Sequence, residues 1–235
     1  MATDNPTLTD FQDRLGLTFN DPSLLERAFI HRSYLNEHPA DGLEHNERLE
    51  FLGDAVLELV VTDFLYKKYP KKQEGDLTAY RSALVNTNSL SRVAEHIGIN
   101  EYLILSKGEA KDTGRARAII LADAVEAIIG AIYLDQGYVT VESFIARNVL
   151  ELIDINKIVE KKLWLDAKSR FQERAQETVG QTPIYKTVKE TGPDHDKQFT
   201  VGVFIGDTQI ALGMGPSKNE AEQKAAEKGI EVKGW

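Results

Sequence analysis

The stretch HNERLEFLGDAVLELVV, residues 45–61, decides how the first part of this chain folds. Its apolar residues recur at the spacing of a helix, which turns by about 100° per residue, and they cover most of the helix circumference. The carboxylates instead gather within less than a quarter turn: Glu47, Glu50, Asp54 and Glu58. We therefore predict a largely buried helix with an acidic stripe along one side.

A second stretch, IILADAVEAIIGAIYL at residues 119–134, repeats this combination. Asp123 and Glu126 are its only side chains that ionise near neutral pH, and they share one helical face because they are three residues apart. A helix that is apolar all round belongs in a protein core. A solvated stripe explains Glu58 well, but it does not explain two acids in such a helix.

If these two helices pack together, four carboxylates converge: Glu50, Asp54, Asp123 and Glu126. Carboxylates that share a buried site repel one another and lose hydration, so they need partners. Mg²⁺ favours carboxylate and water oxygens, and such a set could hold two ions together with a substrate phosphate. Spacing alone leaves two interpretations open, a metal site and a buried network of hydrogen bonds.

Composition narrows the classes of protein. A length of 235 residues suits one medium domain and one small domain. The chain has no cysteine, which excludes disulfides, thiolate nucleophiles and zinc held by Cys. No apolar run approaches the roughly 18 residues that span a bilayer, and the N-terminal residues lack the features of a signal peptide, so we expect a cytoplasmic protein without membrane contact. The net charge of −9 comes from residues 1–160, and this average neither establishes nor excludes a nucleic-acid partner.

The first part of the chain is helical in pattern throughout. Asp21 is expected to cap a helix that has Pro22 at its first position. The expected helices cover residues 24–34, 45–67, 74–84, 86–97, 115–135 and 139–153. The sequence thus predicts an all-α domain over residues 6–155.

The pattern changes after Trp164. Asp166 can cap a helix that runs to Thr178, and a capping box at residues 217–220 starts a last helix. Between them lie three stretches of period-2 alternation, at residues 184–190, 198–205 and 209–213, with turns at 194–196 and 206–207. The sequence predicts a small α+β domain over residues 164–232, of order α-β-β-β-α, with a three-stranded antiparallel sheet and two helices on one face.

Four segments in this order resemble the ribonuclease III family: FIHRSY at 29–34, ERLEFLGDAV at 47–56, EGDL at 74–77 and LADAVEAIIG at 121–130. The last part of the chain is similar to a double-stranded RNA-binding domain, through the order of its elements and the motifs GPDH at 192–195 and GMGPSK at 213–218. The resemblance covers almost the whole chain.

This resemblance implies a Mg²⁺-dependent endoribonuclease that cuts double-stranded RNA, with Mn²⁺ able to replace Mg²⁺. It gives Asp54 and Glu126 catalytic roles and places Glu47 and Glu74 near the scissile phosphate in supporting roles. It assigns no such role to Glu58 or His31, and we interpret His31 as a hydrogen-bonding residue within a helix. The metal ligands that it implies are Glu50, Asp54, Asp123 and Glu126.

The resemblance also implies a homodimer in which Phe51 reaches into the partner subunit, although the residues alone equally fit an ordinary core aromatic at this position. Two sites would cut the two strands and leave a short 3′ overhang, with 5′-phosphate and 3′-hydroxyl ends. Precursors of ribosomal RNA are the expected targets.

The implied RNA contacts lie in the second domain. Gln172 and Glu173 would meet 2′-hydroxyls in the minor groove of the duplex, and the loop with His195 would reach the next minor groove. The start of the last helix would bind phosphates through its free N–H groups. The residues assigned there are Ser217, Lys218, Asn219 and Lys224. Asn219 departs from the family, in which a second Lys is frequent, and this predicts one weaker phosphate contact.

Two other functions compete with this one. A non-enzymatic protein could bind RNA through the second domain while the first only dimerises, but the complete set of acids argues against it. A metal phosphohydrolase could instead act on small substrates, and activity on nucleotides without cleavage of duplex RNA would favour it.

Overall fold

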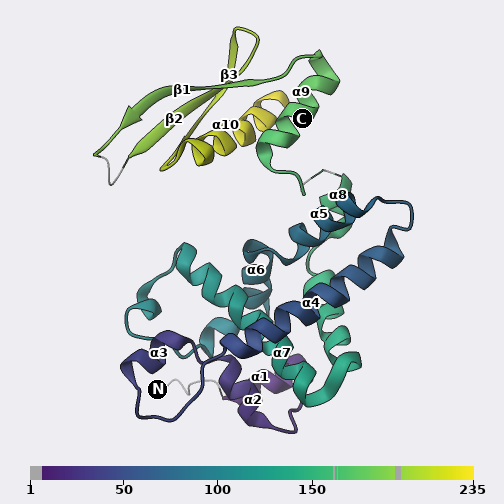
Figure 1. The fold of residues 1–235 in the computed structure, drawn as a ribbon, viewed down its shortest axis with the longest axis vertical. Helices are drawn as coiled ribbons and strands as arrows, with labels where there is room; N and C mark the ends of the chain where they lie inside the picture. The colour runs from purple at the N-terminus through teal and green to yellow at the C-terminus, as the bar shows by residue number, and fades with distance from the viewer. Residues whose placement is uncertain (1–6, 161, 163, 194–196) are drawn as a thin grey trace. The chain divides into compact units, whose positions relative to one another are not determined.

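The computed structural model describes residues 7–160, 162, 164–193 and 197–235 (Figure 1). The chain divides into two units, Met1–Ile158 and Val159–Trp235. The helices of the first part are α1 (Leu8–Leu15), α2 (Pro22–Ala28), α3 (Arg32–Glu37), α4 (Glu47–Lys68), α5 (Glu74–Val85), α6 (Thr87–Ile97), α7 (Arg115–Ile145) and α8 (Ile155–Glu160). Short helical turns join them: η1 (Ile99–Glu101), η2 (Glu109–Lys111) and the π-helical η3 (Ala146–Leu150).

The predicted helix over residues 24–34 is wrong, because the chain leaves helical geometry between Phe29 and His31. There Ile30 forms a parallel bridge with Ile104. The backbone N–H of Ile104 donates to the carbonyl of Phe29 at 2.9 Å, and that of His31 donates to the carbonyl of Ile104 at 3.1 Å. His31 therefore caps α3 and accepts from the Ser33 N–H, instead of lying within a helix.

Helix α7 consists of two helical pieces, since Gly137 has φ 75° and ψ −173°. Only glycine adopts this combination at low cost, and the break matches the gap expected between residues 135 and 139. Helix α8 was not foreseen, because its residues lie where the change of pattern predicted a connection. Among the described residues, no helix reaches the combination of length and apolarity that a bilayer-spanning segment requires.

Helices α4 and α7 pack along each other and form the centre of the first unit (Figure 1). They approach most closely at two glycines. A Cβ on Gly53 would lie 1.7 Å from the carbonyl oxygen of Glu126, and a Cβ on Gly130 would lie 2.2 Å from that of Leu49. Because no side chain fits at either position, these glycines set the distance and register at which the two acidic stretches meet.

The second unit has the predicted order and fold class. It comprises α9 (Ala167–Val179), β1 (Ile184–Thr191), β2 (Gln198–Ile205), β3 (Thr208–Gly215) and α10 (Lys218–Lys233). The strands pair antiparallel in the order β1-β2-β3. Both helices cover one face of this sheet, with a core that contains Ala167, Phe171, Val203, Ala225, Ala226 and Ile230.

The predicted helix starts of this unit are confirmed. The Asp166 carboxylate accepts from the Ser169 N–H at 3.1 Å, and the Ser217 hydroxyl oxygen accepts from the Glu220 N–H at 3.2 Å. The predicted capping box is formed only in part, because the Glu220 carboxylate pairs with Lys224 and not with the backbone N–H of Ser217. The predicted turn at residues 194–196 lies outside the described residues, whereas Gly206 and Asp207 form a turn as expected.

Candidate metal centre and RNA-binding surface

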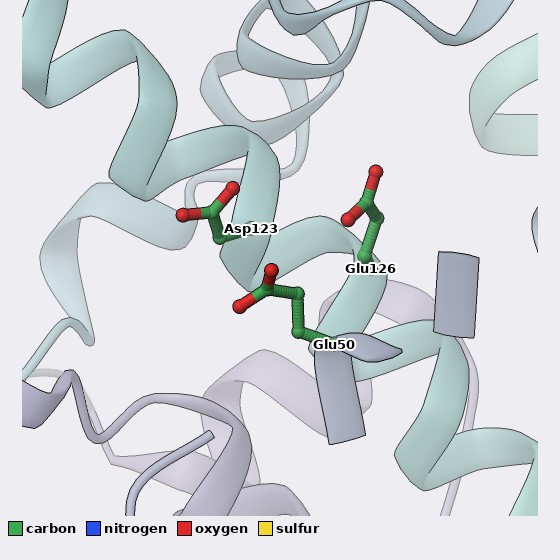
Figure 2. A group of neighbouring side chains, drawn as sticks. All are labelled: Glu50, Asp123 and Glu126. Carbon is green, nitrogen blue, oxygen red and sulfur yellow. The ribbon is translucent and has the colours of Figure 1, made fainter. Parts of the chain in front are cut away.

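Three carboxylates meet where α4 crosses α7. Ligand oxygens of Glu50, Asp123 and Glu126 lie within 4.8 Å of one another. Figure 2 shows Glu50 rising from one helix toward the two acids of the other. The close contact at Gly53 and Gly130 produces this arrangement, since Glu50 lies one turn before Gly53 and Glu126 one turn before Gly130.

The electrostatics of this trio are unfavourable without a cation. The pKa of Glu126 is raised from 4.5 to about 8, chiefly by burial and then by the negative charges of Asp54, Asp123 and Glu50, in that order of importance. Burial also raises the pKa of Glu50 and of Asp123. The surroundings of these half-buried carboxylates disfavour the ionised form. Such a site is suited to a divalent cation, because the cation offsets both the repulsion and the lost hydration.

Asp54 borders this cluster but is not one of the three clustered acids. Its side chain is exposed, and it is the strongest charged neighbour that acts on Glu126. Glu58, one turn further, pairs with Arg81 at 3.8 Å, in agreement with its interpretation as a residue of the solvated face. The donor set of the trio with Asp54 beside it consists of carboxylate oxygens alone, which fits Mg²⁺ or Mn²⁺ and does not fit a soft metal.

A cleft of about 670 Å³ extends from Glu50 and Asp123 along α3 and η2. Glu47 lines this cleft, and its carboxylate lies 3.2 Å from Arg32 and 3.7 Å from His45. Glu47 is therefore next to Glu50, whose pKa its charge raises.

Glu74 lies elsewhere. It lines a separate groove between α4 and α5 with Tyr66 and Leu77, and its carboxylate accepts from the Thr78 hydroxyl at 3.1 Å. The structure thus brings Glu47 to the cluster but does not bring Glu74 there. Phe51 is also not in the core, since it is 82% exposed on α4.

On α9, the two residues expected to contact RNA differ in exposure and in their contacts with other side chains. Gln172 is exposed. Glu173 is half-buried, and its carboxylate accepts from Lys162 at 2.6 Å, while the same lysine lies 3.1 Å from Glu177. His195 lies outside the described residues.

The start of α10 is exposed and carries cations. Lys218 lies 3.1 Å from Glu190 and over the ring of Phe199, and Lys224 lies 2.8 Å from Glu220. Asn219 is exposed, and the Ser217 hydroxyl caps the helix. These ion pairs are on the surface and weak, so phosphates can replace their carboxylates.

Three features of these sites were not predicted: Gly53 with Gly130, Arg32 in the cleft, and Lys162 on Glu173. A glycine inside an apolar helix costs about 1 kcal/mol relative to alanine and indicates a close backbone approach, so the first feature left a signal in the sequence. The other two depend on contacts between segments that no spacing reveals.

Comparison with known proteins gives two family matches. Residues 21–153 match the model described as "Ribonuclease-III-like", and residues 167–233 match the "Double-stranded RNA binding motif". The chain is 47% identical to "Ribonuclease 3" of Carboxydothermus hydrogenoformans over 97% of both chains. It is 43% identical to "Ribonuclease 3" of Enterococcus faecalis, again over 97% of both.

Among solved structures, the fold is similar to the nuclease domain of ribonuclease III from Campylobacter jejuni. The TM-score is 0.56 at 37% sequence identity, and the match covers 62% of this chain and 97% of that domain. The Campylobacter domain shows structural flexibility in a region involved in dimer formation.

Proposed function

The chain belongs to the ribonuclease III family, and we propose that it hydrolyses double-stranded RNA with two Mg²⁺ ions bound where α4 crosses α7. It is a ribonuclease with a helical nuclease domain and a double-stranded RNA-binding domain. The observation that carries the proposal is the trio of Glu50, Asp123 and Glu126. Their raised pKa values indicate that the ionised carboxylates are destabilised, and a bound cation would stabilise them. We assign catalysis to residues 6–155 and duplex binding to residues 164–232.

The residues that would hold the metal are the trio together with Asp54. When bound, the ions supply a Lewis acid for the phosphate and for the attacking water. The Glu126 carboxyl must give up its proton as a cation binds, because a metal ligand has to be ionised. Glu47 supports the site from the cleft, held by Arg32. The role that the resemblance gives to Glu74 stays a prediction, as its groove is separate.

Hydrolysis in this manner leaves a 5′-phosphate on one fragment and a 3′-hydroxyl on the other. We propose that the targets are structured transcripts in the cytoplasm, among them precursors of ribosomal RNA. Mn²⁺ is expected to replace Mg²⁺, since the donor set consists of oxygens.

We propose further that two copies form a homodimer through one face of α4. Three large side chains are exposed in a row along this helix, namely Phe51 (82%), Leu59 (57%) and Tyr66 (72%). A monomer gains nothing from exposing such residues together, and a second copy would bury them. Phe51 would enter the partner subunit, and the two sites would cut opposite strands with a short 3′ overhang.

In the second domain, we propose that Lys218, Lys224 and Asn219 contact phosphates across the major groove. The N-terminus of α10 adds backbone N–H groups that have no acceptor within the helix. The N–H of Glu220 already donates to the Ser217 hydroxyl, and the others are available to phosphate. Gln172, with Glu173 once Lys162 is displaced, would contact 2′-hydroxyls, and His195 would contact the next minor groove. Recognition of this type reads duplex shape, so sequence selectivity should be low and rejection of DNA high.

The proposal is tested with the full chain and a labelled RNA duplex of about 30 base pairs, longer than the roughly 16 base pairs that one binding domain covers. Cleavage is followed with Mg²⁺, with Mn²⁺ and with EDTA, beside a DNA duplex of the same sequence. We expect metal-dependent cutting of RNA alone, with 5′-phosphate ends detected by their removal with a phosphatase. Cutting in EDTA, or equal cutting of DNA, would contradict the proposal.

A further inference from the structure

The cleft beside the acidic trio has a distinctive lining. Three apolar residues of α7 line it, Ala116, Ile119 and Ile120, and the rest of the lining is polar or charged. Four of these polar residues are carboxylates: Glu47, Glu50, Glu109 and Asp123. Among the described residues that line the cleft, Arg32 is the one with a permanent positive charge.

Arg32 is held at the cleft with most of its hydrogen-bonding capacity still available. Its guanidinium donates to the Glu47 carboxylate at 3.2 Å, yet 68% of its side chain remains exposed. Its charge reaches the trio, because burial raises the pKa of Asp123 and of Glu50 and the positive charge of Arg32 opposes part of that rise. A guanidinium has five N–H donors, so one bond to Glu47 leaves donors free for another oxygen ligand.

The phosphates of an RNA strand that enters this cleft would be repelled by its carboxylates. Cations bound by Glu50, Asp123 and Glu126 would neutralise the scissile phosphate, but they do not remove the repulsion that Glu47 and Glu109 exert on the neighbouring one. A guanidinium matches phosphate geometry and binds it through two parallel hydrogen bonds. Arg32 is the side chain in this cleft that can supply them.

We propose that Arg32 binds a phosphate of the cleaved strand next to the scissile phosphate, and so positions that strand in the cleft of His31, Asn36 and Glu109. Glu47 holds the guanidinium in place before the strand arrives. This inference rests on the proposed function, since it assigns a substrate contact to the same site. It makes Arg32 a substrate-binding residue and not a metal ligand.

A purely structural role for Arg32, as a brace for Glu47, leads to different expectations. Loss of the positive charge of Arg32 makes the site more negative. Mn²⁺ should therefore bind as tightly as before or tighter, whichever role Arg32 has. Only the phosphate contact also predicts weaker binding of the duplex. If the proposal holds, Arg32→Ala therefore weakens duplex binding without weakening Mn²⁺ binding.

The test compares Arg32→Ala and Arg32→Lys with Arg48→Ala in the full chain. Arg48 is the matched control. It is an exposed arginine that follows Glu47 at the start of α4, but it lines a different groove, with Leu43 and Glu44. KM for the RNA duplex is measured with Mg²⁺, duplex affinity is measured as a function of salt, and Mn²⁺ binding is followed by electron paramagnetic resonance without RNA.

For Arg32→Ala we expect KM to rise about tenfold and the slope of log affinity against log salt to fall by about 0.9, the value for one lost phosphate contact. Arg32→Lys should recover part of the loss, and Arg48→Ala should match the wild type. Mn²⁺ affinity should stay the same or increase.

An unchanged KM and salt slope in Arg32→Ala would overturn the inference while the wild type still cuts RNA. An equal loss in Arg48→Ala would overturn it as well, since general charge would then explain the effect. A wild type that binds duplex but never cuts it would instead refute the proposed function, and the salt slopes would still decide the assignment of Arg32.

Discussion

The crossing of α4 with α7 and the surface of α9 and α10 carry charge in opposite ways. At the crossing, half-buried acids lie among apolar residues, and burial raises the pKa of Glu50, Asp123 and Glu126. On α10, Lys218 and Lys224 are exposed and paired with carboxylates. The first arrangement costs folding free energy that a bound cation can offset, whereas the second costs little. We infer that the proposed metal centre depends on the burial of like charges, whereas the proposed duplex-binding surface depends on exposed positive charges.

The largest effect is expected when a charge is removed where α4 crosses α7. Asp123→Asn keeps the shape but removes one proposed metal ligand, so cleavage of the RNA duplex should fall roughly 1000-fold, as expected when several kcal/mol of metal-derived stabilisation are lost. Duplex affinity should stay within about twofold of the wild type, since phosphate contacts elsewhere provide it. Glu95→Gln, which neutralises an exposed acid on α6, is the control and should cleave normally.

A second change tests whether the glycines create the crossing. Gly53→Ala adds a Cβ that would lie 1.7 Å from backbone of α7, so the helices must separate. The free energy of unfolding should drop by about 3 kcal/mol, the upper end for overpacking, and cleavage should fall with it. Gly75→Ala is the matched control, as nothing lies within 4 Å of the added Cβ, and denaturant unfolding should show it to be as stable as the wild type or more stable.

The half-buried Glu126 carboxyl should make the stability of the protein depend on pH. The Glu126 carboxyl has a pKa of about 8 in the folded protein against 4.5 in the unfolded chain. The folded state therefore holds a proton that unfolding releases between these pH values, and stability must fall as pH rises from about 4.5 to about 8. Thermal unfolding of the metal-free protein should show this decline.

Glu126→Gln removes the titrating group, so its stability should vary less over the same pH range. Saturating Mn²⁺ should likewise flatten the curve of the wild type. A wild-type curve that rises through this range would contradict the electrostatic account of the crossing.

The smallest effect is expected on the second surface. Lys218→Ala removes one proposed phosphate contact, and duplex affinity should fall about threefold to tenfold with a salt slope reduced by about 0.9. Lys186→Ala is the control, because Lys186 lies over the ring of Phe204 and follows Tyr185, which packs into the core on the helix side of the sheet. Filter binding over a range of salt concentrations would show equal losses for both variants if the surface were assigned wrongly.

The two regions also differ in how well the sequence predicts them. The α-β-β-β-α order was predicted from alternation and caps, because each element of that domain forms from local signals such as Asp166 and Ser217. In the first domain, local signals misplaced the helix at residues 24–34, since the bridge between Ile30 and Ile104 joins segments far apart in the chain.

The candidate site shows the same limit. Spacing indicated that Glu50, Asp54, Asp123 and Glu126 share a site, because acids in apolar helices are conspicuous. Three of these acids form a cluster, and Asp54 borders it. The position of Arg32 beside Glu47 depends on how α3 is placed, and the separation of Glu74 depends on the packing of α5. Such contacts arise from tertiary packing, which periodicity does not encode.

The most direct test of the division between the two regions is the single-turnover cleavage rate at saturating RNA duplex and Mg²⁺, compared for Glu126→Gln and Lys218→Ala. We predict that Lys218→Ala reaches the wild-type rate once the duplex saturates it, whereas Glu126→Gln stays inactive although it is fully bound. A Glu126→Gln protein that cuts at the wild-type rate would contradict this division, as would a Lys218→Ala protein that stays slow at saturation.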